Sequence, residues 1–412
     1  MTELFLKDIK SHQIVDWNQL IHDLKNIKSY NPYCKSNNIY EVFKCIILSM
    51  LLGEEIILLD SDFTNEELIK LTGNSNYSKY NKSIENINLF FEHKTDMVNL
   101  LRQTSNNWKI TLFTSGTTGI PKKVVHDFNS ITRFVKYSKT NANAVWGFAY
   151  NPTHIAGVQV FLQALLNGNS IVNLFGLSPS EIFREIKENN ITHISATPTF
   201  YRLLLPSSKV FPSVQRITTG GERFSEQVIN QLKTIFPNAK ITNIYALTEA
   251  GTLFASENDV FIVKPEYENF IKIDNGILFI HHSLMGDTNT DIGEWYNTGD
   301  LVEIIETHPL KFRFIARKTE MINVGGYKVN PIEVEDAILS MPEVKEVRVY
   351  PKKNSVLGNI VCCDIVCENN QTIKESTIRN YLQTKLQEFK IPRIIRFVEE
   401  VQKTRTGKTK RK

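Results

Sequence analysis

Small hydroxyl residues and glycines are concentrated in one short segment that ends on a lysine. Residues 114–122 read Thr-Ser-Gly-Thr-Thr-Gly-Ile-Pro-Lys. Glycines leave the backbone N–H groups of such a segment accessible, the hydroxyls add donors, and Lys122 adds a positive charge. This combination favours the binding of phosphate oxygens. The segment does not follow the Walker pattern, because no Gly-Lys-Ser/Thr follows four residues after the first glycine. A flexible turn is the alternative interpretation.

Three further polar segments follow predicted strands of one sheet. Short apolar runs alternate with helix-length amphipathic runs between about residues 146 and 246, with strands expected at 146–150, 170–175, 192–197, 215–221 and 240–246. This alternation predicts a largely parallel sheet with helices on both faces, and ligands gather beyond the carboxyl ends of such strands. His154, the Gly-Gly-Glu of 220–222 and the Tyr-Ala-Leu-Thr-Glu of 245–249 lie just beyond three of these ends.

The last ten residues, Lys-Thr-Arg-Thr-Gly-Lys-Thr-Lys-Arg-Lys, contain six basic side chains. A basic tail can attract nucleic acid or a membrane surface, which is one interpretation of this segment. The tail lacks interleaved aromatic residues, no second basic patch is present, and the net charge of the chain is only +4. We therefore expect no nucleic-acid partner and consider a chemical role for Lys408.

In order along the chain, these segments resemble the motifs of the adenylate-forming (AMP-binding) superfamily. That superfamily includes acyl- and aryl-CoA synthetases, peptide-synthetase adenylation domains and luciferases. The other matching segments are 243–249, the Tyr-Asn-Thr-Gly-Asp of 296–300, 317–335 and 404–408. The resemblance runs from about residue 110 to the C-terminus and is weaker over the first hundred residues.

The resemblance implies binding sites for ATP and Mg²⁺. The residues implied in ATP binding are Thr114, Ser115, Gly116, Thr117, Thr118, Gly119, Lys122, Gly220, Gly221, Glu222, Tyr245, Asp300 and Arg317. Asp300 would accept hydrogen bonds from both ribose hydroxyls, and Tyr245 would offer a ring face to the adenine. The alternatives are a turn-forming role for Asp300 and a surface ion pair for Arg317.

The residues implied in catalysis are Lys408, Thr248 and Glu249. Thr248 would contact the phosphates, and Glu249 would bind Mg²⁺ through a carboxylate oxygen, unless it is a solvated surface acid. A carboxylate that attacks the α-phosphate brings two anions together. The compact positive charge of Lys408 would offset their repulsion.

The carboxylic acid and its acceptor are less closely specified by the sequence. Residues 151–159 contain no acid that could pair with a substrate ammonium group, so we expect a substrate other than an amino acid. His154 would gate the pocket or orient the carboxylate, unless it only begins a helix. Gly325, Gly326 and Tyr327 resemble the family's thiol-channel loop, which serves either coenzyme A or an acyl or peptidyl carrier protein.

The expected fold class is α/β, with two domains. Residues 1–316 would form a large domain of mostly parallel sheets covered by helices, with a small β-subdomain. Residues 317–412 would form a small mobile α+β domain that carries the catalytic lysine. Thr319 stands where the hinge residue of the family is often Asp or Lys.

The remaining features concern location and a competing interpretation. The most apolar run, about residues 42–51, is too short to span a membrane and predicts a buried helix. Five cysteines without framework spacing indicate buried thiols in a reducing compartment, so we expect a cytoplasmic protein. The sequence thus predicts an AMP-forming acid–thiol ligase with coenzyme A as the expected acceptor and a carrier protein as the alternative acceptor. A degenerate relative that binds adenylate without turnover is the alternative.

Overall fold

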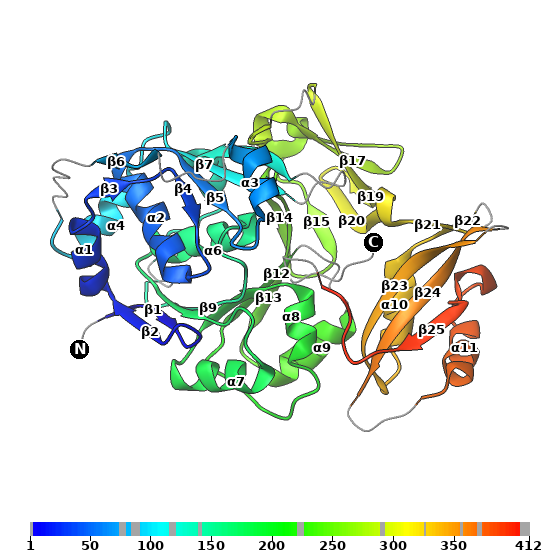
Figure 1. The fold of residues 1–412 in the computed structure, drawn as a ribbon. Coiled ribbons are helices and arrows are strands. Elements are labelled where there is room, and N and C mark those ends of the chain that lie inside the picture. The colour runs from blue at the N-terminus through cyan, green and yellow to red at the C-terminus, as the bar shows by residue number, and fades with distance from the viewer. Residues whose placement is uncertain are drawn as a thin grey trace.

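The computed structural model describes residues 3–73, 80–83, 91–114, 121–138, 142–220, 226–288, 293–324, 327–354, 357–368 and 373–403. Two sheets with their helices form the first and largest part of the chain, a smaller β-rich part follows, and a separate α/β unit comes last (Figure 1). None of the helices in the described ranges is long and apolar enough to cross a membrane.

The largest sheet has eight strands. Their spatial order is β14 (Gly251–Ser256), β13 (Lys240–Leu247), β12 (Arg216–Gly220), β11 (His193–Ala196), β9 (Val145–Phe148), β10 (Ser170–Asn173), β1 (Leu4–Asp8) and β2 (Gln13–Asp16). Neighbouring strands from β13 to β1 are parallel, and the two edge strands β14 and β2 are antiparallel. The predicted parallel sheet is confirmed, and each predicted strand agrees with the observed one to within two residues at either end.

Helices cover both faces of this sheet because successive side chains of a strand point to opposite faces. On β10, Ile171 packs in the cluster that contains α6 (Ile155–Leu165). The next residue, Val172, packs in the cluster that contains α7 (Pro179–Glu188), α8 (Pro198–Leu203) and α9 (Glu226–Ile235).

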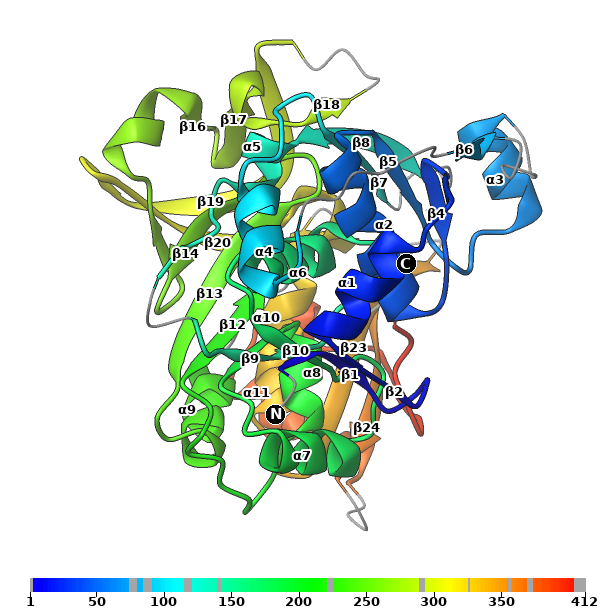
Figure 2. The ribbon, with the colours of Figure 1, turned by 90° about the vertical axis from the view of Figure 1, so that its left-hand side faces the viewer.

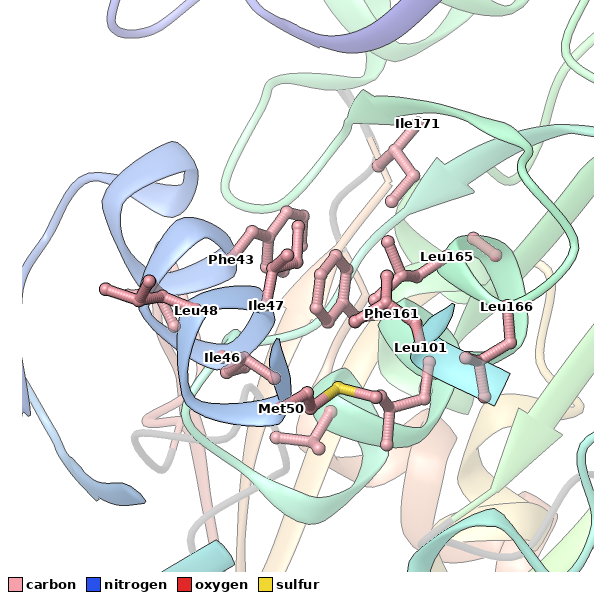
Figure 3. Packing of buried hydrophobic residues seen from close by; sticks show 14 of the residues in the cluster. Phe43, Ile46, Ile47, Leu48, Met50, Leu101, Phe161, Leu165, Leu166 and Ile171 are labelled. Atoms are coloured by element: carbon pink, nitrogen blue, oxygen red, sulfur yellow. The ribbon is translucent and has the colours of Figure 1, made fainter. Parts of the chain in front are cut away.

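A five-stranded sheet lies on the far side of α6. Its strands are, in spatial order, β18 (Asp287–Thr288), β8 (Lys122–Asp127), β7 (Lys109–Thr114), β5 (Ile56–Leu59) and β4 (Tyr33–Lys35). In Figure 2, α6 lies between this sheet and the eight-stranded one. Figure 3 shows α2 (Ile39–Leu52) packing on α6, where the rings of Phe43 and Phe161 stack at 3.8 Å. The apolar run near residue 45 is therefore the buried helix that the sequence predicts.

The other helices and strands of the first part lie around these sheets. They are α1 (Trp17–Lys25), β3 (Ser29–Tyr30), α3 (Asn65–Thr72), β6 (Lys82–Ser83), α4 (Lys94–Arg102) and α5 (Phe128–Thr132). Strands β3 and β6 pair as a separate antiparallel ribbon.

An antiparallel sheet forms the β-rich part. Its order is β15 (Val260–Ile262), β20 (Leu310–Arg317), β19 (Trp295–Thr307), β17 (Ile277–His281) and β16 (Ile271–Asp274). One short 3₁₀ helix (Pro265–Phe270) precedes β16 and another (His282–Leu284) follows β17. The long hairpin of β19 and β20 places Asp300 opposite Arg317 in register.

The C-terminal unit has its own sheet and core. The strands are β22 (Tyr327–Val329), β21 (Ile322–Val324), β24 (Gly358–Cys367) and β23 (Val344–Asn354), and β25 (Ile394–Phe397) pairs with β24. Helices α10 (Pro331–Leu339) and α11 (Glu375–Gln383) contribute to the same apolar cluster. Cys362 and Cys363 are buried thiols of β24.

One helix prediction is too long. Ile378, Leu382, Leu386 and Phe389 recur at helical spacing and predict a helix from residue 375 to residue 389. In the structure, α11 ends at Gln383 and a 3₁₀ helix follows at Glu388–Lys390. Leu386 and Phe389 still pack on the apolar cluster of this unit. These two residues are apolar because they pack on the core, so the helical spacing of apolar residues continues beyond the end of the helix.

Candidate active site

A cavity of about 1980 Å³ lies where the eight-stranded sheet, the β-rich part and the C-terminal unit meet. Its lining includes predicted site residues that are far apart in the sequence: Lys122, His154, Gly220, Tyr245, Thr248, Glu249, Asp300 and Arg317. Because parallel strands place their carboxyl ends at one edge, residues after β12 and β13 meet there. The structure therefore brings these residues together around one cavity.

Asp300 is held by side chains from two other strands. The hydroxyl of Tyr245 in β13 donates to Oδ2 of Asp300 at 2.5 Å, and Nε of Arg317 donates to Oδ1 at 2.9 Å. The backbone N–H of Asp300 donates to Oγ1 of Thr298 at 3.0 Å. Burial raises the pKa of Asp300, while the charge of Arg317 and the hydrogen bond from Tyr245 oppose that rise.

This carboxyl group retains capacity for a ligand. A carboxylate has about four acceptor sites, and two are used by Tyr245 and Arg317. Asp300 is only 1% exposed, so its position is fixed by packing as well as by these bonds. The sequence analysis did not predict the hydrogen bond from the Tyr245 hydroxyl to Asp300. The ring of Tyr245 packs against that of Phe254, with 5.7 Å between the ring centroids.

The carbonyl groups of Thr248 and Glu249 are also held in place. Nε2 of His126 in β8 lies 2.7 Å from the Thr248 carbonyl, and since a carbonyl only accepts, Nε2 carries the proton. Burial lowers the pKa of this imidazole, which favours the neutral form. The N–H of Gly286 donates to the Glu249 carbonyl at 2.7 Å. A Cβ atom at residue 286 would lie 2.6 Å from the Val125 carbonyl oxygen, so this close approach requires glycine.

The Glu249 carboxylate could serve as one ligand of a cation whose other ligands are phosphate oxygens and water. The hydroxyl of Tyr296 donates to Oε1 of Glu249 at 3.3 Å, and burial, followed by the charge of Glu249, raises the pKa of that hydroxyl. Across the described ranges, no three potential metal-ligating side chains cluster. Mg²⁺ is usually bound by one or two carboxylates together with phosphate oxygens and water. Glu249 is therefore suited to hold Mg²⁺ beside a bound triphosphate.

The segment that the sequence predicts to bind phosphate lies between β7 and β8 along the chain. These strands pair so that Thr114 and Lys122 are opposite each other, and Lys122 lines the cavity. Ser115, Gly116, Thr117, Thr118 and Gly119 lie outside the described residues, as do Gly221 and Glu222. Gly220 ends β12, where a Cβ atom would approach the Ile244 carbonyl oxygen to 2.8 Å, so a side chain would force β12 and β13 apart.

His154 is paired with an acid that the sequence analysis did not identify. Nε2 of His154 lies 3.0 Å from Oδ2 of Asp60, directly after β5. The other oxygen of Asp60 accepts from Asn151 at 2.8 Å and from Thr153 at 2.6 Å. Burial alone would raise the pKa of Asp60, but His154, Thr153 and Asn151 outweigh it and lower the pKa to about 2. An acid just after a buried strand was the available signal.

The chain before the C-terminal tail is fixed against β23 and reaches the cavity. Lys403 lines the cavity and its Nζ lies 3.4 Å from Oε2 of Glu346. Nη1 of Arg348 donates to Oε1 of Gln402 at 2.8 Å. Lys408 lies beyond the described residues.

Tyr327 is a predicted site residue that the structure does not bring to the cavity. Its side chain is 60% exposed, stacks on Phe389 at 4.6 Å and is absent from the described lining of the cavity. Gly325 and Gly326 lie outside the described residues. Thr319, by contrast, lines the cavity from a 3₁₀ helix (Lys318–Glu320) that follows β20.

Family models agree with this arrangement. The AMP-binding enzyme family model matches residues 47–269, and the model of the AMP-binding enzyme C-terminal domain matches residues 333–408. The chain therefore belongs to the AMP-binding enzyme family.

Individual proteins resemble this chain at sequence identities of 18% to 26%. The chain is 26% identical over 350 residues to the mitochondrial acyl-coenzyme A synthetase of Mus musculus, covering 73% of this chain and 60% of that protein. It is 24% identical over 397 residues to 2-succinylbenzoate–CoA ligase of Staphylococcus epidermidis, covering 87% and 82%. The fold is similar to that of o-succinylbenzoate coenzyme A synthetase of Bacillus subtilis in complex with ATP and magnesium. That likeness has a TM-score of 0.69 at 18% identity, over 99% of this chain and 95% of that one.

Proposed function

We propose that this protein is an AMP-forming acid–thiol ligase that activates a carboxylic acid with ATP and transfers the acyl group to coenzyme A. The observation that carries the proposal is the shared cavity. One space contains the Asp300 carboxylate held by Tyr245 and Arg317, the Glu249 carboxylate, and His154. The names of the mouse and Staphylococcus relatives support coenzyme A as the acceptor.

The proposed reaction has two balanced steps. A carboxylate oxygen attacks the α-phosphorus of ATP, the bond to the β-phosphate oxygen breaks, and pyrophosphate leaves. A thiol then loses its proton, its sulfur attacks the acyl carbon, and AMP leaves with the electron pair of the broken C–O bond. Bound Mg²⁺ would neutralise phosphate charge in the first step. Holding both reactants in one cavity supplies the orientation that the attack requires.

Asp300 and Arg317 would hold the ribose, and Glu249 would hold the cation. The remaining hydrogen-bond capacity of Asp300 suits two vicinal hydroxyls. His126 and Gly286 keep the backbone of Thr248 and Glu249 in position, so these side chains are preorganised before the nucleotide binds.

Lys408 would enter the same cavity during adenylation. It lies five positions after Lys403, and an extended chain of five residues spans at most about 18 Å. Because Lys403 lines the cavity, a side chain five positions further along would be within reach of an α-phosphate bound there. Tyr327 and the adjacent glycines would act in the second step, after the unit beginning near residue 317 rotates.

We propose a non-amino carboxylic acid as the substrate. Residues 151–159 contain no acid, and the carboxyl group closest to His154 is Asp60, which is already engaged by three side chains. A cytoplasmic location is supported by the free thiols of all five cysteines.

Acid-dependent pyrophosphate release tests this proposal. The whole chain is mixed with MgATP and a panel of fatty, aryl and α-amino acids, with and without coenzyme A. We expect pyrophosphate release with non-amino acids and thioester formation only when coenzyme A is present. Release without transfer to coenzyme A, but with transfer to a holo carrier protein, would identify the other acceptor. ATP binding without release for any acid would identify a non-catalytic relative and contradict the proposal.

A further inference from the structure

The amino ends of the parallel strands form a second polar region of the same cavity. His193 of β11 is in register with Arg216 of β12 and with Trp146 of β9. Residues in register on adjacent parallel strands point to the same face of the sheet. All three line the cavity, together with Ser195 and Thr218 further along the same strands. This row leads from Gly220 at the nucleotide side to Arg216, about 13 Å away along β12.

The opposite wall of this region has little hydrogen-bonding capacity left. Nε2 of Gln159 donates to the Ile131 carbonyl at 3.2 Å, and its Oε1 accepts from Thr252 at 3.0 Å. Gln163 binds both the N–H and the carbonyl of Lys136 at 2.8 and 3.0 Å. These amides are therefore committed to the protein.

His193 and Arg216 differ from these glutamines. Within the part of the chain that the structure describes, Nε2 of His193 has no hydrogen-bond partner, although the residue is only 4% exposed. Its Nδ1 lies 2.8 Å from the Thr192 hydroxyl, and its ring lies 4.8 Å from that of Trp146. Burial first, and then the charge of Arg216, lower the pKa of His193 to about 4, so the ring is neutral at pH 7. A neutral ring can donate one hydrogen bond from Nε2.

The nearby carboxylates do not neutralise Arg216. Among the described residues, no carboxylate lies within ion-pairing distance of its guanidinium group. Glu257 pairs with Lys240 at 2.6 Å, and Asp259 lies 2.6 Å from Nε of Arg313. A buried polar atom without a partner is costly, and a guanidinium group binds carboxylates in a bidentate manner. This end of the cavity is therefore complementary to an anion.

We propose that the carboxylic acid substrate carries a second carboxylate at the end remote from the reacting group, and that Arg216 and His193 bind it. This inference rests on the proposed function, because it assigns the acid that the adenylation site would activate. The distance of about 13 Å between Gly220 and Arg216 favours a diacid of intermediate length. Arg216 and His193 determine specificity and do not contact the reacting atoms.

Matched acids test the proposal on the whole chain. Values of kcat/KM for pyrophosphate release are measured for straight-chain α,ω-diacids and for monoacids of the same carbon number. We expect the diacids to be preferred, with a maximum at an intermediate length that the monoacid series lacks. Arg216→Gln should reduce the ratio of diacid to monoacid kcat/KM about fivefold or more, mainly through KM. The effect is modest for a charged contact because Arg216 is exposed to solvent.

Two further variants separate the specific effect from a general one. Lys240→Gln removes a cation from the adjacent strand in register with Arg216, and Lys240 is not among the residues that line the cavity, so the ratio should not change. Arg216→Glu should shift the preference from diacids to ω-amino acids of equal length. Equal kcat/KM for diacids and monoacids, or an unchanged ratio in Arg216→Gln, would overturn the inference and leave the proposed function intact. No release with any acid would overturn both.

Discussion

At the end of the cavity proposed to bind the nucleotide, Asp300 already accepts hydrogen bonds from two side chains, whereas at the other end Nε2 of His193 has no partner among the described residues. Thr248 and Glu249 are likewise supported by His126 and Gly286. Arg216, in contrast, has no acid beside it in the described part of the chain.

This difference indicates how the two ends would work. Groups that bind the same nucleotide in every turnover gain from preorganisation, since no reorganisation is needed when the reaction occurs. Groups that discriminate between acids gain from having no hydrogen-bond or ion-pair partner within the protein. The correct substrate then supplies the partner, whereas a wrong substrate leaves these groups unpaired. Substitutions at the nucleotide end should therefore affect all acids equally, and those at the other end should affect particular acids.

The largest effect is expected from Lys408→Ala. Adenylate formation should slow by a factor of about 10²–10³ or more for every acid, because the charge that offsets carboxylate–phosphate repulsion is lost. Thioester formation from premade acyl-adenylate and coenzyme A should change little. Stopped assays of the two half-reactions measure this, with Lys410→Ala as the control for general tail charge. Equal losses in both half-reactions, with the variant folded, would contradict the proposed domain rotation.

A smaller effect is expected from Asp300→Ala. The loss of charge-assisted hydrogen bonds to the ribose, worth roughly 1.5–3 kcal/mol each, should weaken ATP binding at least tenfold. Calorimetry with ATP measures this directly. Tyr245→Phe keeps the carboxylate and removes one of its supports, so its effect should be smaller. If Asp300→Ala binds ATP like the wild type, Asp300 is only a turn residue.

The smallest effect on activity is expected from Asp60→Asn. His154 would lose its anionic partner, so kcat/KM for the acid should fall a few-fold while ATP affinity is retained. The pKa of Asp60 is lowered from 3.8 to about 2, which corresponds to about 2 kcal/mol of folding free energy. This stabilisation is complete above about pH 4 and is lost as the pH falls through about 2.

Denaturant unfolding of Asp60→Asn at pH 7 measures that contribution. The free energy of unfolding should fall by about 2 kcal/mol, and the difference from wild type should narrow only below pH 4. Glu66→Gln, which removes an acid from the exposed pair with Lys70 on α3, is the matched control. A difference no larger than that of the control would mean that Asp60 does not stabilise this part of the molecule.

Much of the fold was predictable because the local and global signals agree. The strands of the parallel sheet are short apolar runs, and capping residues mark several helices. Ser178 and Glu181 form a capping box at α7, and Pro179 occupies its first turn. Segment 114–122 stands out because phosphate binding requires its residue types, and segment 245–249 stands out because it lies at the carboxyl end of a predicted strand.

The rest depends on contacts between distant residues. Asp60 is a single acid in an ordinary sequence, and its pairing with His154 arises only when β5 and the start of α6 meet. His126 likewise acts through the Thr248 carbonyl, 122 residues away. Arg216 was not identified, because its relation to His193 depends on the register of β11 and β12.

The transfer of ¹⁸O from a labelled carboxylic acid tests the central claim most directly. The acid is labelled in both carboxylate oxygens and turned over with MgATP and coenzyme A, and the products are analysed by mass spectrometry. If the acid attacks the α-phosphorus in this cavity, one ¹⁸O atom per thioester formed will appear in AMP and none in pyrophosphate. Label in inorganic phosphate with ADP as the nucleotide product, or no acid-dependent label in AMP, would contradict the account.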